Sequence, residues 1–168
     1  MIAPATKVRQ LARPAGIPVR YLLVFVLFLL STVAFLDRTN ISIAGVALAQ
    51  EYGLSQIQLG WVFSAFLIGY AGFQIPAGWL AVRLGPRNIL TLGVLWWGVF
   101  TALTAIVSPA ASHALIALIL VRFGLGVGES VIYPAANQFV ARWVPVHERG
   151  KANGWIFAGV GAGAGLTP

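Results

Sequence analysis

The chain alternates between long apolar runs and short polar connections. The runs predict helices at about 19–49, 56–81, 89–107, 114–140 and 151–168. A hydrocarbon layer of about 30 Å needs roughly 20 helical residues, because each residue rises 1.5 Å. The runs therefore predict five membrane-spanning helices, of which the last is barely long enough to cross.

The first run allows two interpretations. Its uninterrupted part, residues 21–36, holds sixteen apolar or small residues, which is slightly short for a span. Beyond Asp37 and Arg38 the apolar pattern resumes as ISIAGVALA. Either one long helix places both charges inside the membrane, or the helix ends at Asp37 and leaves them at the outer interface. The apolar pattern alone does not decide between the two.

Two further charges lie inside the fourth run, in the stretch VRFGLGVGESVIYP. Arg122 and Glu129 are seven residues apart, close to two helical turns, so they share a face about 10 Å apart along the axis. An ionisable group at membrane depth costs at least ~2.5 kcal/mol and normally faces a cavity or a partner. These charges therefore predict a functional site.

Polar residues of other kinds also fall within the runs. Tyr70 and Gln74 lie one turn apart in the second run, and Tyr133 lies one turn beyond Glu129. Such groups need protein partners within lipid, so their faces are expected to point inward. Trp96 and Trp97, in the middle of the third run, are expected to serve packing.

Composition supports the membrane assignment. Hydrophobic residues make up 59% of the chain and charged residues 9%, which predicts an all-α, multi-spanning membrane protein in contact with the lipid bilayer. The net charge is +7, yet the nine cations outside the runs gather in three places separated by whole spans: Lys7, Arg9, Arg13 and Arg20; Arg83 and Arg87; Arg142, Arg149 and Lys151. Positive loops stay cytoplasmic, so the N-terminus is predicted to be cytoplasmic and no nucleic-acid partner is expected.

Residues 1–18 are proline-containing and cationic, and they predict a flexible cytoplasmic tail before a helical domain at 19–168. Ser55 and Gln58 match a capping box that starts the second helix, and Gly85 with Pro86 predicts a turn before the third. Pro134 is expected to interrupt the hydrogen bonds of the fourth helix.

Several classes of function find no support in the sequence. It has no cysteine, and His113 and His147 lie in connections on opposite sides, so no metal site is expected. An intramembrane aspartyl protease needs two aspartates, and the chain has Asp37 alone. We therefore predict neither an enzyme nor a cofactor.

Five segments, in this order, carry a resemblance to a known family: FLDRTNISIA, GYAGFQIPAGWL, GWLAVRLGPR, RFGLGVGESVIYPAANQFVARWVP and HERGKANGW. With them the chain resembles the N-terminal half of a major facilitator superfamily transporter, most closely the anion:cation symporter branch. The resemblance implies the first five helices of a six-helix half, in a twelve-helix transporter of the cell (inner) membrane. Each half consists of 3+3 inverted repeats. It also implies the long first helix, with Asp37 and Arg38 lining a central cavity.

The function that the resemblance implies is symport of a small organic anion, such as a sugar acid, with a proton. Desolvation and nearby guanidinium groups act oppositely on the proton affinity of a carboxylate, so we assign proton coupling to Asp37 and Glu129. Protonation of either carboxylate would free Arg122, while the planar fork of Arg38 suits a substrate carboxylate. The predicted substrate contacts are those of Arg38, Arg122, Tyr70, Gln74, Tyr133 and Asn137.

The resemblance also implies a cytoplasmic gating loop with Gly78, Arg83, Gly85 and Arg87. Val82 stands where the family usually has an acidic residue, and no glutamine follows Gln138, although some sugar-acid members have one in the fifth helix. The alternative is a truncated, non-transporting fragment or a membrane partner subunit. In that case the C-terminal six-helix half would be missing, and the four charges would form only a structural ion-pair network.

Overall fold

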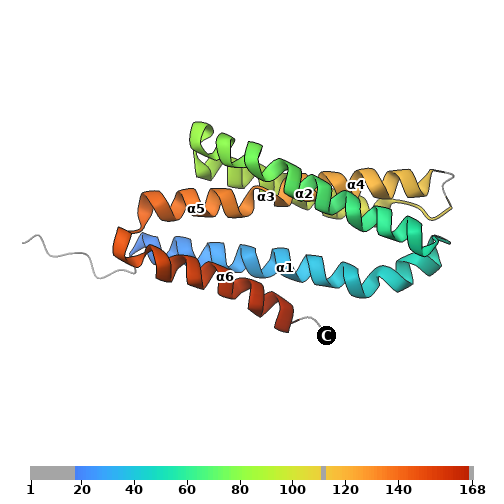
Figure 1. Cartoon of the computed structure of the whole chain (residues 1–168), viewed down its shortest axis with the longest axis horizontal. Coiled ribbons are helices and arrows are strands. Elements are labelled where there is room, and N and C mark those ends of the chain that lie inside the picture. The colour runs from blue at the N-terminus through green and yellow to red at the C-terminus, as the bar shows by residue number, and fades with distance from the viewer. Residues whose placement is uncertain (1–17, 111–112, 167–168) are drawn as a thin grey trace, which may run out of the picture.

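The computed structural model describes residues 18–110 and 113–166, and in these ranges it contains helices and short connections (Figure 1). The helices are α1 Val19–Glu51, α2 Gln56–Leu84, α3 Pro86–Ile106, α4 Ala114–Glu129, α5 Ile132–Trp143 and α6 Arg149–Gly165, with a 3-10 turn at Val146–Glu148. The predicted all-α class is confirmed. Almost all of the predicted tail, and the last two residues of the predicted fifth span, lie outside the described residues.

Within the described residues, four segments are long and apolar enough to cross a membrane: α1, α2, α3 and the combined segment Ala114–Trp143, which holds α4 and α5. Helix α6 has 17 residues, fewer than the roughly 20 of a full span. In Figure 1 the helices run lengthwise beside one another.

Helix α1 is continuous, so the structure has the long form of the first helix with Asp37 and Arg38 in its interior. Some side-chain hydroxyls within it donate to carbonyl groups of the helix itself. Thr32 Oγ1 donates to the Phe28 carbonyl over 3.0 Å, and Ser42 Oγ donates to the Arg38 carbonyl over 3.3 Å. Such bonds allow hydroxyl groups to lie at membrane depth.

The most extensive packing joins α2 to α4 and α1 to α6. Both contacts depend on glycine. A Cβ atom at Gly126 of α4 would lie 2.9 Å from the Tyr70 nitrogen of α2, and one at Gly163 of α6 would lie 2.6 Å from the Thr32 carbonyl oxygen of α1. Small residues let backbones come this close. The two pairs are equivalent in a 3+3 repeat, where the second helix of each repeat packs on the first helix of the other.

Replacing Gly69 by alanine should therefore weaken the α2–α4 contact. The added Cβ atom would meet the Phe123 carbonyl of α4 and lie 3.3 Å from the Val127 nitrogen, and backbone cannot move aside cheaply. We expect a loss of about 1–3 kcal/mol in the free energy of unfolding, as for other overpacked sites. Thermal unfolding in detergent measures it.

Gly72→Ala is the matched control, because the same helix has nothing within 4 Å of a Cβ atom at that position. Alanine is the better helix former by about 1 kcal/mol, so this variant should be as stable as the native chain or more so. Equal stability of the two variants would contradict the close α2–α4 approach.

The connection between α2 and α3 differs from the predicted loop. It consists of Gly85, with φ 85° and ψ 145°, a conformation open to glycine, and Pro86 begins α3 directly. Because one residue turns the chain, α2 extends to Leu84 and α3 begins at Pro86, a few residues beyond the predicted limits of about 81 and 89. Of the predicted gating residues, Gly78 and Arg83 therefore lie on α2 and Arg87 on α3.

The predicted fourth helix is divided into α4 and α5 at Ser130 and Val131. The break lies three to four residues before Pro134, which lacks an N–H group and whose ring clashes with the carbonyl four residues earlier. Ser130 Oγ donates to the Val127 carbonyl over 2.7 Å and so satisfies its hydroxyl at the break. Glu129 is thus the last residue of α4.

Candidate functional site

The centre of the molecule holds an ion pair between α1 and α4. The guanidinium group of Arg38 donates to Glu129 Oε1. The Glu129 side chain is 2% exposed and that of Arg38 is 28% exposed. Glu129 therefore pairs with Arg38, and our expectation that its protonation would free Arg122 is corrected. The position of α1 relative to α4 decides the partner, which spacing within α4 could not reveal.

Arg38 also lies against aromatic rings of α2. Its guanidinium carbon is 4.3 Å from the centroid of the Tyr70 ring and 5.3 Å from that of Phe66. Cations over aromatic faces are attracted by the ring quadrupole, more strongly where water is excluded. Arg38 is thus held by a carboxylate and by aromatic rings, from two different helices.

Asp37 and Arg122 form a second, looser part of the cluster. Trp97 Nε1 of α3 donates to Asp37 Oδ2 over 3.1 Å. Arg122 is 6% exposed and interacts electrostatically with Asp37, without a salt bridge between them in the described part of the chain. Its Nε has no hydrogen-bond partner there. From the sequence we expected Trp97 to serve packing. A buried indole N–H also needs an acceptor, and this requirement could have indicated a polar partner for Trp97.

Arg38 lies between two pockets and lines both. The first, which we call the Asp37 pocket, has a volume of about 160 Å³ and is lined by Asp37, Arg38, Ile41, Ser42, Phe63, Phe66, Leu67, Arg122, Leu125 and Glu129. The second, which we call the Tyr133 pocket, is lined by Phe35, Arg38, Tyr70, Gln74, Tyr133, Phe157 and Val160. All four charged residues line the first pocket, and Arg38 alone brings charge to the second.

The structure brings most of the predicted substrate residues together. Tyr70, Gln74 and Tyr133 share the Tyr133 pocket with Arg38, whereas Arg122 lines the Asp37 pocket. The Tyr133 hydroxyl is 3.1 Å from Ser31 Oγ. Asn137, one turn further along α5, is exposed and lines neither pocket, and its substrate contact stays a prediction.

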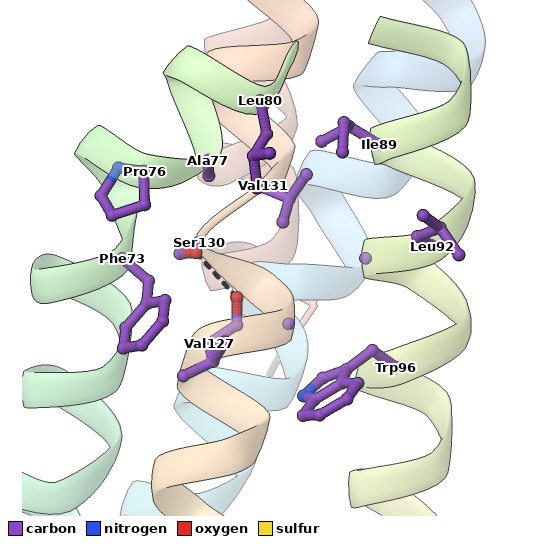
Figure 2. Close-up of a pocket in the computed structure, with 12 residues that line it drawn as sticks. Phe73, Pro76, Ala77, Leu80, Ile89, Leu92, Trp96, Val127, Ser130 and Val131 are labelled. Carbon is purple, nitrogen blue, oxygen red and sulfur yellow. Dashed lines mark hydrogen bonds between the residues drawn. The ribbon is translucent and has the colours of Figure 1, made fainter. Parts of the chain in front are cut away.

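A third pocket of about 210 Å³ lies between α2, α3 and the end of α4 (Figure 2). Its labelled side chains are apolar except for Ser130, whose hydroxyl bonds to the Val127 carbonyl, and the indole of Trp96 at its edge. This pocket offers an anion no partner. The two pockets beside Arg38 therefore form the candidate site.

Among the described residues, no three His, Cys, Asp or Glu side chains come close enough to hold a metal ion. The site is built instead from guanidinium groups, carboxylates and phenol hydroxyls. Such groups can bind an anion and exchange a proton within one protein interior.

Charges that line pockets between membrane-spanning helices are typical of integral membrane proteins with a functional site in their interior. The family model described as Major Facilitator Superfamily matches residues 27–168, and the chain belongs to this family. The implied membrane protein of several spans is thereby confirmed.

Curated relatives carry the names of anion transporters. The chain is 39% identical over 152 residues to the probable sulfoacetate transporter SauU of Cupriavidus necator, covering 90% of this chain and 34% of that protein. It is 39% identical to the probable galactarate/D-glucarate transporter GarP of Escherichia coli, covering 82% and 31%. It is 36% identical to the sodium-dependent phosphate transport protein 1 of Arabidopsis thaliana, covering 88% of this chain and 28% of that protein.

Solved structures also support membership of this family. A bacterial homolog of the human lysosomal transporter Spinster, in an inward-facing and unoccupied conformation, matches with a TM-score of 0.77 and 30% identity. The match covers 89% of this chain and 30% of that structure. The chain thus spans about a third of the length of the relatives it matches.

Proposed function

We propose that this chain belongs to a secondary transporter that carries a small organic anion, such as a sugar acid or another carboxylate, together with a proton. The observation that carries the proposal is the buried Arg38–Glu129 pair at the boundary of two pockets. The anion-transporter names of the relatives support the substrate class.

The anion is proposed to bind Arg38 from the Tyr133 pocket. A guanidinium group presents parallel N–H donors that match a carboxylate. Tyr70, Gln74 and Tyr133 line the same pocket and offer hydroxyl and amide groups to the polar substituents of a sugar acid. Arg122, in the Asp37 pocket, would attract the anion electrostatically.

The proton is proposed to act through Glu129. While Glu129 is ionised it holds the Arg38 guanidinium, and a bound anion must compete with it. Protonation removes that competitor and leaves Arg38 to the anion. Asp37, beside Arg122, is the second proposed proton site.

The transport unit is proposed to be a twelve-helix protein of the cell membrane with its N-terminus in the cytoplasm. The described helices supply one wall of its cavity, and a C-terminal six-helix half is the proposed partner. This rests on the family's repeat architecture and on the greater length of the relatives. The three cationic groups of the sequence support the orientation.

Uptake by proteoliposomes tests the proposal. Proteoliposomes that contain the protein encoded by the complete reading frame should accumulate galactarate or sulfoacetate when the outside is acidic. Proteoliposomes with the 168-residue chain alone should not. Absence of uptake by the complete protein at every pH would favour the alternative, a membrane subunit in which the ion pair only joins α1 to α4.

A further inference from the structure

Two neighbouring tryptophans on α3 use their indole N–H groups differently. Trp96 Nε1 donates to the Gly124 carbonyl of α4 over 2.8 Å, and its ring lines the apolar pocket (Figure 2). Trp97 Nε1 donates to the carboxylate of Asp37 on α1 over 3.1 Å. Trp96 is 49% exposed and Trp97 is 7% exposed.

Close packing of α3 on α4 explains how Trp97 reaches α1. A Cβ atom at Gly128 would lie 2.9 Å from the Trp97 nitrogen, so glycine brings the two backbones together. The Trp97 ring belongs to a buried apolar cluster with Ala34, Leu125 and Ile132. The indole N–H is the polar atom of this ring, and Asp37 is its acceptor.

We propose that Trp97 is a positioning residue that holds the Asp37 carboxylate and sets the pH at which Asp37 takes up its proton. The inference rests on the proposed function, in which Asp37 is a proton site. A hydrogen bond donated to a carboxylate favours the ionised form. Removing this donor should therefore change the pH dependence of uptake.

Other charged groups face Asp37 as well. Arg122 and Glu129 approach from α4, and Arg38 is its neighbour on α1; all three line the Asp37 pocket. The residues that α2 contributes to this pocket are apolar. From α3, the Trp97 indole N–H reaches Asp37. Replacing Trp97 leaves all these charges in place, so a change in pH dependence would report the lost N–H donor.

Trp97→Phe in the complete transporter is the first test. It keeps an aromatic ring in the cluster and deletes the donor. We expect the midpoint of the pH dependence of uptake to move by about one pH unit, which is about a tenfold change in proton concentration. Trp96→Phe is the matched control: it deletes the same N–H group one residue away and should leave the midpoint unchanged.

Asp37→Asn separates failure of this inference from failure of the proposed function. If Asp37→Asn retains the native pH dependence, Asp37 is not a proton site, and the proposed function no longer includes proton coupling through Asp37. If Asp37→Asn loses the pH dependence and Trp97→Phe keeps the native midpoint, the positioning role of Trp97 is wrong.

Fluorescence of the 168-residue chain in lipid nanodiscs gives a second readout that needs no transport. Protonation of Asp37 should change the emission of Trp97 and give a pH-dependent component. Trp97→Phe and Asp37→Asn should each lose that component, whereas Trp96→Phe should keep it. A full pH-dependent component in Trp97→Phe would overturn the proposal.

Discussion

Replacing Glu129 by glutamine is expected to abolish proton-driven uptake while exchange of bound anion across the membrane continues. Glutamine has nearly the same shape as glutamate but carries no charge, so it leaves Arg38 permanently available to the anion. The variant resembles the protonated state and cannot return to the ionised one. Uptake driven by a pH gradient should fall to background, and release of preloaded labelled anion by external anion should persist, both measured in proteoliposomes of the complete protein.

Glu51→Gln is the matched control for this experiment. Glu51 is an exposed carboxylate at the end of α1, remote from both pockets, and its replacement should leave proton-driven uptake at native levels. Native uptake in Glu129→Gln would show that Glu129 does not couple the proton to the anion.

The second large effect concerns the free energy of unfolding of Arg38→Gln. This change leaves Glu129, whose side chain is 2% exposed, without its cationic partner. Breaking a buried ion pair from one side typically costs about 3–5 kcal/mol, because an uncompensated charge remains buried. We expect a loss near this range at neutral pH, measured by thermal unfolding in detergent.

The double variant Arg38→Gln with Glu129→Gln should recover most of that stability, since no unpaired charge remains. The same double variant should still lack proton-driven uptake. If it is both stable and fully active, the pair serves only to hold α1 and α4 together and does not couple the proton to the anion.

The helices were predictable from the sequence because lipid imposes a simple rule on composition. A run of apolar residues of the right length must form a helix that satisfies its own backbone. The start of α2 was predictable as well: the Ser55 side chain accepts the Gln58 N–H and the Gln58 side chain accepts the Ser55 N–H, as the capping box requires.

The choice of partners within the site was not predictable from the sequence alone. Spacing places Arg122 and Glu129 on one face of α4, yet Glu129 pairs with Arg38 of α1, because a contact between helices depends on where they cross. Trp97 lies in an apolar run, and nothing in its periodicity indicates that Asp37 is its acceptor.

The sequence predicts a turn at Gly85 and Pro86 but not that the connection is a single residue. A short cationic stretch between two apolar runs does not show how many residues remain helical. The glycine conformation makes a one-residue connection possible and keeps Arg83 on α2, where its guanidinium carbon lies 3.9 Å from the Trp79 ring centroid.

Because Arg38 lines both pockets, events in one are thermodynamically linked to events in the other. Linkage is reciprocal: if protonation on the Glu129 side raises anion affinity tenfold, a bound anion raises proton affinity tenfold. The proposed transporter would then load its two cargoes in either order and reach the same doubly loaded state. Adding anion to the protein in unbuffered solution should then cause the protein to take up protons. A measured rise in the pH of the solution would show this reciprocal linkage at equilibrium.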